Sequence, residues 1–388
     1  MSWPMVKLSD VAVIVTGGTP KTSDPSLYGG AVPFVTPSEL VGNIPVTDTP
    51  RRLTKKGAEA VRIVPANSIM VCCIGSLGKI GIAGTAVATN QQINSVIFDQ
   101  RSVDVRYGFY ACQRLENRLK SMAPATTVPI VSKSKFQNLE IPLPPLFEQK
   151  RIASILDQAD DIRRKARLSL AKVELLGQAC FQSMFGNPAT NTKDWKMVCI
   201  GDLLSEAKYG TSEKANTEGR GIPILRMGNI TYDGRIDLTD IKHVELSGRD
   251  LPKYTTRRGD ILFNRTNSQD LVGKTAVVQF DQPMAIAGYL VRARTNQNAS
   301  PAYISAYLNS AHGKTVLRNM CNNIVGMANI NAQQMQKIKI AAPPVDMQLK
   351  YSRMIDEMQE RSGPMREAMD YSDALFSSLQ HRAFRGEL

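Results

Sequence analysis

The stretch IPLPPLFEQKRIASIL, residues 141–156, marks a change in the character of the chain. Its adjacent prolines, Pro144 and Pro145, resist continuation of a helix from upstream and suit the first turn of a new one. Charged and apolar residues then follow with helical spacing. The stretch IAAPPVDMQLKYSRMI, residues 340–355, repeats this arrangement about half the chain later. The sequence therefore predicts two long helices, each of which begins at a proline pair.

Other segments recur in the same order at nearly the same separation. Trp3 is followed by Trp195 after 192 residues, and the matching segments further along drift to a separation of 199. The matched pairs are PANSIMV at 65–71 with RRGDILF at 257–263, LGK at 77–79 with VGK at 272–274, and FQNLEIPLPP at 136–145 with MQKIKIAAPP at 335–344. Because the order is kept in both halves, we interpret the chain as a tandem duplication.

Each copy begins with about 140 residues that read as mixed and mostly β, because short apolar runs alternate with Gly, Pro and Asn turns. A modest helix is predicted near 104–120 and again near 301–318.

The two long helices carry a narrow apolar stripe in which spacings of three and four residues alternate, as in a coiled coil. The expected seam residues are Ile152, Ile155, Ile162, Val173 and Leu176 on the first helix, and Ile355, Met358, Met365, Met369, Phe376 and Leu379 on the second. An ordinary helix facing a core would show a similar stripe, but two equivalent helices favour mutual antiparallel packing. Gly363-Pro364 should kink or interrupt the second helix. Leu156, Leu170 and Leu175 lie off the seam, which indicates further partners.

Composition narrows the class of protein. The chain has 388 residues, six cysteines and three histidines. The cysteines form no CxxC pair, so neither a disulfide framework nor a structural zinc site is expected. No stretch approaches the roughly 20 apolar residues that span a bilayer, and the start has no signal-peptide core. We therefore expect a cytoplasmic protein.

The formal net charge of +13 is unevenly distributed. Residues 1–140 carry +6 and residues 190–339 carry +7, whereas 141–189 carry +2 and 340–388 carry −2. The positive charge thus lies on the two globular segments and is nearly absent from the predicted helices. This partition favours two separate modules that bind a polyanion.

Motifs of catalytic sites are incomplete. SQDLVGKTAV at 268–277 resembles a phosphate-binding loop, but Ser268 stands where the first glycine is needed. No GxGxxG follows a predicted strand, and no Asn/Asp-Pro-Pro-aromatic motif is present. His243, His312 and His381 are scattered and show no metal-ligand spacing. We therefore predict no catalytic residue and no metal site.

Several loops instead combine side chains that suit base edges and phosphates. They are TGGTPKTSD at 16–24, IGSLGK at 74–79 and TNQQIN at 89–94 in the first copy, and YGTSEK at 209–214, LRMGNI at 225–230 and FNRTNSQDLVGK at 263–274 in the second. The candidate DNA contacts are Thr19, Lys21, Ser76, Lys79, Gln91, Gln92, Asn94, Ser212, Lys214, Arg226, Asn229, Asn264, Arg265, Asn267 and Lys274. Such residues also build ordinary turns. Arg265 and Lys274 rank highest, since a cationic loop tip otherwise has little purpose.

With these features, the sequence resembles the specificity subunits of type I restriction–modification systems. The resemblance covers the whole chain and rests on the two-copy plan, on IPLPPLFEQKRIASILDQAD, and on TGGTP, LRMGNI and GDILFNRTNSQDLVGKTAV. It implies an α+β fold with two target recognition domains, at 1–143 and 188–342, separated by spacer helices at 144–187 and 343–388. The helices would form an antiparallel coiled coil with a pseudo-twofold. The second junction lacks the Glu-Gln-Lys-Arg of the first, so the spacer departs from full symmetry.

The resemblance also implies a non-catalytic subunit that reads a bipartite DNA target with a nonspecific gap. Two methyltransferase subunits would dock on the helices and bind S-adenosylmethionine, while this chain binds no cofactor. Restriction and translocation subunits would join through the methyltransferase core. Two alternatives stay open from the sequence: a stand-alone DNA-binding regulator, and an enzyme such as a nuclease whose active site is not recognisable.

Overall fold

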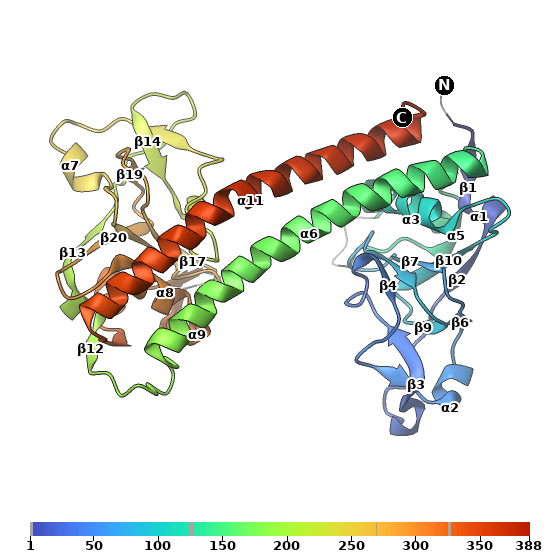
Figure 1. The fold of residues 1–388 in the computed structure, drawn as a ribbon, viewed down its shortest axis with the longest axis horizontal. Coiled ribbons are helices and arrows are strands. Elements are labelled where there is room, and N and C mark those ends of the chain that lie inside the picture. The colour runs from blue at the N-terminus through green and yellow to red at the C-terminus, as the bar shows by residue number, and fades with distance from the viewer. Residues whose placement is uncertain (1–2, 124–127, 269, 325–326) are drawn as a thin grey trace. The chain divides into compact units, whose positions relative to one another are not determined.

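The computed structural model describes residues 3–123, 128–268, 270–324 and 327–388, without the side chains of 322–324 and 327. Contacts within the chain divide it into two units. Unit 1 comprises Met1–Arg167 and Glu367–Leu388, and unit 2 comprises Leu168–Arg366. Each unit therefore holds one globular region together with parts of both long helices, α6 (Leu146–Phe185) and α11 (Val345–Arg385) (Figure 1).

The first globular region contains a five-stranded sheet with the order β2-β10-β7-β8-β4 and a four-stranded sheet with the order β5-β3-β9-β6. Most neighbours are antiparallel, but β4 pairs with β8 and β3 with β9 in parallel. Strand β1 pairs with β11. The strands are β1 Met5–Lys7, β2 Ala12–Thr16, β3 Tyr28–Val35, β4 Gly42–Val46, β5 Arg52–Leu53, β6 Ile63–Val64, β7 Ile69–Cys72, β8 Ile80–Ala83, β9 Val87–Thr89, β10 Ile93–Phe98 and β11 Glu140–Pro142.

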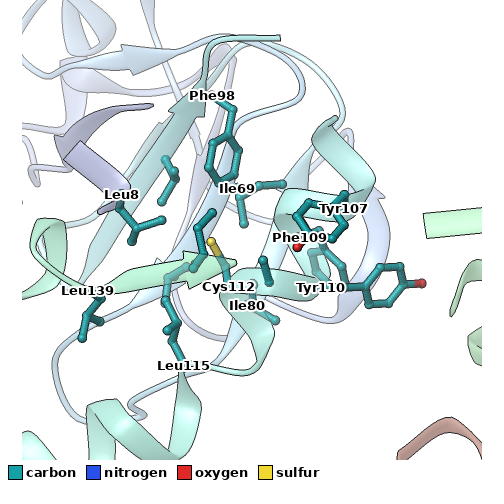
Figure 2. Packing of buried hydrophobic residues seen from close by; sticks show 14 of the residues in the cluster. Leu8, Ile69, Ile80, Phe98, Tyr107, Phe109, Tyr110, Cys112, Leu115 and Leu139 are labelled. Atoms are coloured by element: carbon teal, nitrogen blue, oxygen red, sulfur yellow. The ribbon is translucent and has the colours of Figure 1, made fainter. Parts of the chain in front are cut away.

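Helix α3 (Val105–Gln113) lies against the five-stranded sheet and completes the core of this region (Figure 2). It begins at Asp104, whose side chain accepts a hydrogen bond from Tyr107 N at 3.0 Å, as a helix N-cap does. Tyr107, Phe109 and Tyr110 are fully buried. The other helical segments are α1 Leu8–Val11, η1 Pro25–Leu27, α2 Lys55–Glu59, α4 Glu116–Met122 and α5 Lys133–Gln137.

The second globular region repeats the strand pairing of the first. Its four-stranded sheet has the order β13-β20-β16-β18, which matches β2-β10-β7-β8. The parallel pair β14-β19 matches β3-β9, and β12-β23 matches β1-β11. The predicted duplication is thus present in the topology. The strands are β12 Met197–Cys199, β13 Leu204–Tyr209, β14 Ile222–Leu225, β15 Lys242–Val244, β16 Ile261–Asn264, β17 Thr266–Asn267, β18 Thr275–Val277, β19 Ala285–Ile286, β20 Leu290–Thr295, β21 Asn322–Ile324, β22 Met327–Asn329 and β23 Lys339–Ala341.

The helical segments of this region also correspond to those of the first. Helix α8 (Pro301–Asn309) buries Tyr303 and Tyr307 and contacts β18, much as α3 contacts β7 and β8. The others are η2 Ile200–Leu203, η3 Met227–Asn229, α7 Leu251–Tyr254, α9 Ala311–Met320 and α10 Ala332–Gln336. The fold is therefore α+β, with two similar regions of mixed, mainly antiparallel sheet.

Each proline pair is followed by a helix whose first turn is joined to its globular region by a buried glutamine. The amide oxygen of Gln149 accepts from Asp104 N at 2.8 Å, and its nitrogen donates to Ser102 O and Pro144 O at 3.0 and 2.8 Å. The amide of Gln348 makes the corresponding three bonds, to Ser300 N at 3.0 Å, Asn298 O at 3.3 Å and Pro343 O at 2.8 Å. Both glutamines are fully buried. The repeated junction therefore places the start of a helix against the start of α3 or α8.

The two tryptophans act at the other ends of the long helices. Trp3 Nε1 donates to Ala383 O at 2.9 Å in the last turn of α11, and Trp195 Nε1 donates to Phe185 O at 3.1 Å at the end of α6. Such bonds satisfy carbonyls that have no partner within a helix end. Each globular region thus holds the first turns of one long helix and the last turns of the other.

The long helices pair antiparallel within each unit. In unit 1, Arg167 of α6 forms an ion pair with Asp373 of α11 at 2.8 Å. In unit 2, the rings of Phe181 and Tyr351 lie 5.7 Å apart, edge to face. In unit 1, Arg151 near the start of α6 also donates to Leu388 O, just past α11, at 2.9 Å. Rising numbers on α6 thus meet falling numbers on α11, and the predicted antiparallel direction is confirmed.

The predicted seam is only partly correct. Ile152 and Phe376 are buried, and Ile155, Val173, Ile355, Met358, Met369 and Leu379 are half-buried. Ile162, Leu176 and Met365, by contrast, are 56%, 52% and 36% exposed. Leu156 and Leu170, expected to be off the seam, are buried, whereas Leu175 is exposed as expected.

Arg163 gives the physical reason for the error at Ile162. Its guanidinium lies 4.0 Å from the centre of the Phe376 ring and pairs with Asp160 and Asp373. A cation–π and ionic contact therefore occupies this level of the helix pair, and the neighbouring Ile162 points to solvent.

Gly363-Pro364 does not interrupt α11, which runs unbroken from Val345 to Arg385. Of the two outcomes expected there, the interruption is absent, and the kink stays a prediction. Pro364 is exposed, so the carbonyl that loses its intrahelical partner there can be hydrated. Neither this helix nor any other in the described part of the chain is long and apolar enough to cross a membrane.

Candidate nucleic-acid interface

In the first globular region, the predicted polar loops meet at one end of the five-stranded sheet. Gly17 N donates to Ile93 O at 3.0 Å, Gly18 N to Thr89 O at 2.9 Å, and Cys73 N to Gln92 O at 2.7 Å. A Cβ on Gly17 would lie 2.3 Å from the carbonyl oxygens of Thr89 and Asn90, so this close approach requires glycine. Segments 16–19, 73–76 and 89–92 are therefore held side by side.

The side chains of these loops divide into exposed and buried groups. Thr19 Oγ1 donates to Gln91 Oε1 at 2.5 Å, and both residues are exposed, as is Lys21. Gln92 is half-buried and donates to Ile74 O at 3.2 Å. Asn94 is 3% exposed and accepts from Thr16 Oγ1 at 2.6 Å, so the expectation that it lies on the loop surface is wrong. Its side chain instead joins β10 to β2.

Ser76 and Lys79 flank a second part of this surface. Together with Glu116 and Lys120 of α4 they line a hollow of about 460 Å³. Lys120 pairs with Glu116 at 2.6 Å, whereas Lys79 and Ser76 are exposed. Lys79 can therefore reach an external anion.

In the second globular region, the corresponding segments also converge. Gly210 N donates to Leu290 O at 3.2 Å, Arg265 N to Tyr289 O at 3.0 Å, and Ile330 N to Arg265 O at 2.9 Å. Segments 209–214, 264–267, 286–290 and 328–330 therefore meet at the end of the sheet formed by β13, β20 and β16. Ser212 and Lys214 are exposed there, and Asn267 is half-buried.

Arg265 occupies the centre of this group. Its guanidinium lies 4.9 Å from the centre of the Tyr209 ring, and the Tyr209 hydroxyl accepts from Ala332 N at 2.9 Å. Within the described residues no carboxylate forms an ion pair with Arg265. A stacked guanidinium of this kind suits guanine or phosphate. The nearby Tyr289 is 55% exposed, and Tyr209 is 41% exposed.

Neither tyrosine was singled out from the sequence. An exposed aromatic ring can stack on a base, but tyrosine is equally common in cores, and exposure does not follow from the local sequence. One local feature could have pointed to Tyr209: it directly precedes Gly210, a glycine against which the backbone of Ile286 packs closely.

Arg226 and Asn229 act mainly inside the protein. Arg226 Nη2 pairs with Asp240 Oδ2 at 2.7 Å. Asn229 is 3% exposed; its oxygen accepts from Arg226 N at 2.9 Å, and its nitrogen donates to Asp237 O and Asp240 O at 2.9 and 3.1 Å. The LRMGNI segment is thus held by its own hydrogen bonds, and Asn229 is not the surface residue that we expected.

Asn264 and Lys274 are also not at a loop tip. Asn264 is fully buried and Lys274 is 8% exposed, with its Nζ donating to Met227 O at 3.1 Å. Burial lowers the pKa of Lys274. Gly273, directly before it, has φ +77°, and a Cβ there would lie 2.6 Å from Leu317 of α9. The VGK turn therefore packs inward, against a helix.

No group of three or more His, Cys, Asp or Glu among the described residues is arranged to hold a metal ion. The surfaces above consist instead of hydroxyl, amide, guanidinium, ammonium and aromatic groups. Such a set can bind a polyanion and read base edges.

Comparison with known proteins identifies the family. The model of the type I restriction modification DNA specificity domain matches residues 2–172 and 192–361. The EcoKI specificity subunit of Escherichia coli (strain K12) is 27% identical over 295 residues, which cover 70% of this chain and 62% of that protein. The StySPI specificity subunit of Salmonella potsdam is 22% identical over 423 residues, covering 100% of this chain and 89% of the relative.

The crystal structure of a type I restriction–modification S subunit from M. genitalium has the same fold. It matches with a TM-score of 0.61 at 14% identity and covers 99% of this chain and 96% of that one. The two specificity domains found by the family model correspond to the two globular regions and their adjoining helices. The chain therefore belongs to the type I restriction modification DNA specificity family and carries two copies of its domain.

Proposed function

We propose that this chain is the non-catalytic DNA-recognition subunit of a type I restriction–modification complex. Each globular region reads one half of a bipartite DNA target, and the bases between the halves are not read. The observation that carries this proposal is the presence of two specificity domains in one chain. The positive charge of both globular segments and the convergence of their polar loops support it.

We further propose that two methyltransferase subunits dock on the long helices, and that restriction subunits join through them. Exposed apolar side chains on both helices support a protein partner, since Leu175 is 63%, Tyr371 76% and Leu375 50% exposed. S-adenosylmethionine then binds to the methyltransferase, not to this chain. The complex acts in the cytoplasm, where the DNA is.

The test is co-expression with the neighbouring methyltransferase gene, followed by single-molecule sequencing of host DNA for methyladenine. We expect a bipartite motif with a fixed gap that disappears when the gene for this chain is deleted. Unchanged methylation after deletion, or no association with a methyltransferase, would favour a stand-alone DNA-binding regulator.

A region exchange assigns the halves. Replacing residues 188–342 with the corresponding region of a relative should change one half of the motif and leave the other half intact. The matched exchange of residues 1–143 should change only the other half. If either exchange alters both halves, the two regions do not read DNA independently.

A further inference from the structure

The two globular regions hold one position of their loop surfaces in the same backbone frame. In the second region, Arg265 N donates to Tyr289 O at 3.0 Å, and in the first region Cys73 N donates to Gln92 O at 2.7 Å. The carbonyl of each accepts a further backbone hydrogen bond, at 2.9 Å in both regions. Arg265 and Cys73 therefore occupy equivalent positions of the duplicated fold.

The residue before a closely packed glycine gives a second pair of equivalent positions. Tyr209 precedes Gly210 at the end of β13, and Thr16 precedes Gly17 at the end of β2. A Cβ would lie 2.2 Å from a carbonyl oxygen at Gly210 and 2.3 Å from one at Gly17. Since β13 and β2 also hold matching places in their sheets, Tyr209 and Thr16 are equivalent. The same frame thus carries different side chains in the two regions.

In the second region, the Arg265 side chain is held in place but has no acceptor. Its guanidinium lies 4.9 Å from the centre of the Tyr209 ring, and the Tyr209 hydroxyl accepts from Ala332 N at 2.9 Å. No acceptor among the described residues bonds to the guanidinium, and its Nε is buried without a partner there. Arg265 is half-buried, and Tyr209 and Tyr289 are 41% and 55% exposed. The guanidinium is therefore held on an aromatic ring at a surface that an external ligand can reach.

In the first region, the equivalent side chains are covered or already bonded. Cys73 is 2% exposed. Thr16 Oγ1 donates to Asn94 Oδ1 at 2.6 Å, and the Gln92 amide donates to Ile74 O at 3.2 Å. The position that Arg265 occupies in the second region is therefore uncharged and buried in the first.

This difference between the two copies separates two roles that Arg265 could have on DNA. Phosphates are the same in every half-site, so a contact that only positions the DNA serves both regions alike. The exposed Lys79 and Lys214, one in each region, can supply such contacts. A contact to a base edge depends instead on the sequence of one half-site, and it has no reason to recur. Among base edges, guanine offers the O6 and N7 acceptors that a guanidinium binds with two hydrogen bonds.

We propose that Arg265, positioned by Tyr209, reads a guanine in the DNA half-site of the second region. The inference rests on the proposed function and adds to it the identity of one base pair. The aromatic ring restricts the guanidinium before DNA arrives, so less conformational entropy is lost when its two hydrogen bonds form. The first region makes no such contact from the equivalent position, because Cys73 is uncharged and buried.

The first experiment removes one acceptor from the DNA. Each guanine in the half of the methylation motif that the second region reads, on either strand, is replaced in turn by deazaguanine, in which carbon stands in place of N7. Binding of the full chain with its co-purified methyltransferase is measured by fluorescence anisotropy. At one position, the replacement should weaken binding by wild type about tenfold or more, because a hydrogen bond to a charged group is lost. If no replacement weakens binding, or if this half contains no guanine, the proposal is overturned.

The second experiment links that guanine to Arg265. Arg265→Ala should bind the ordinary duplex about 5- to 150-fold more weakly than wild type and should no longer distinguish guanine from deazaguanine at that position. Tyr209→Leu keeps the charge and should lose part of this discrimination. Lys214→Ala is the matched control, since it removes an exposed cation from a neighbouring loop, and it should keep the discrimination in full. If Arg265→Ala binds every duplex more weakly but still discriminates, Arg265 contacts a phosphate and the proposal fails.

The outcomes separate this inference from the proposed function. If exchange of residues 188–342 changes one half of a bipartite motif while the guanine effect survives Arg265→Ala, the function stands and the guanine assignment fails. If no methylation motif depends on this chain, the proposed function fails and the assignment fails with it. Because the first experiment uses wild type alone, it tests for the guanine contact even if a variant does not fold.

Discussion

Gln149 and Gln348 hold equivalent places at the two helix junctions. Each is fully buried, and each amide forms three hydrogen bonds. Two of them join a long helix to the segment before α3 or α8, and the third is to the carbonyl of a proline just before the long helix. Two of the partners in each set are backbone carbonyls and one is a backbone N–H. A side chain without the amide cannot satisfy all of them.

Gln149→Ala should therefore lower the free energy of unfolding by about 3 kcal/mol, since three backbone groups lose their partner in a closed space. Denaturant unfolding monitored by circular dichroism measures the change. Gln158→Ala, at an exposed position of the same helix, should change stability by less than about 0.5 kcal/mol. A loss below 1 kcal/mol at Gln149 would mean that water replaces the amide.

Arg265 is the residue for which we expect the largest effect on DNA. Arg265→Lys keeps the charge but loses the flat guanidinium that stacks on Tyr209, so affinity should fall by about 1–3 kcal/mol. Fluorescence anisotropy with the motif duplex measures this loss, and methylation sequencing should show relaxed specificity in one half only. Arg258→Lys, an exposed position paired with Asp281, should have a smaller effect. No loss of affinity in Arg265→Lys would indicate that the charge alone matters, because lysine keeps it.

The convergence of the polar loops could be predicted from the sequence. Which of their side chains are exposed to solvent could be predicted less well. Thr19, Gln91 and Arg265 lie on the expected surfaces because glycine turns and polar strand ends are local signals. Lys79 and Lys274 follow similar Gly-Lys turns, yet one is exposed and the other buried. Burial depends on which distant segment covers a turn, here Met227 above Lys274. That information is not contained in the turn itself.

At the scale of elements, the sheet of the second region contains an ionic cluster between β13, β16 and β20. Arg292 of β20 is fully buried and pairs with Glu206 of β13 at 2.5 Å, while Arg294 pairs with Asp260 at 2.8 Å. Lys208, which bonds to the second oxygen of Glu206 at 2.6 Å, is the largest cause that lowers the pKa of this carboxyl to about 2. Charge pairs thus join neighbouring strands of this sheet, whereas the corresponding strands of the first region carry other residues.

This cluster predicts a dependence of stability on pH. Because the folded-state pKa of Glu206 lies below its usual value of 4.5, its contribution is fully present above pH 4.5 and is lost as the pH falls toward 2. Acid unfolding of Glu206→Gln should therefore show a shallower loss of stability between pH 4.5 and 2 than wild type. Glu213→Gln, at an exposed position, should follow the wild-type curve. A Glu206→Gln curve parallel to wild type would rule out this contribution.

The long helices show how far an element can be predicted from its own sequence. Their starts followed from the proline pairs, and their antiparallel direction followed from the duplication. The residues of the seam could be predicted only in part. Leu156 is covered by the first globular region, and Arg163 occupies a position in the contact between the two helices. A seven-residue pattern cannot show which of two adjacent partners an apolar residue meets.

At the scale of the whole molecule, each unit has its own principal core. Phe136 of α5 belongs to the core of unit 1, and Met335 of α10, at the matching position of the second copy, belongs to that of unit 2. Each is no more than 1% exposed.

Two thermal transitions are therefore expected in calorimetry. Phe136→Ala should destabilise unit 1 by about 3–5 kcal/mol and Met335→Ala should destabilise unit 2 by about 2–5 kcal/mol. Each variant should shift one transition and leave the other in place. If both transitions move together in either variant, the units unfold as one cooperative body.

The chain contains only two tryptophans, and each indole N–H is bonded to the last turn of a different long helix. Each unit therefore contains one intrinsic fluorophore, Trp3 in unit 1 and Trp195 in unit 2. With Trp3→Phe or Trp195→Phe, the emission of the remaining indole reports on a single helix end, without any dye. Stopped-flow fluorescence of these two variants can therefore time the arrival of DNA or a partner subunit at each end separately.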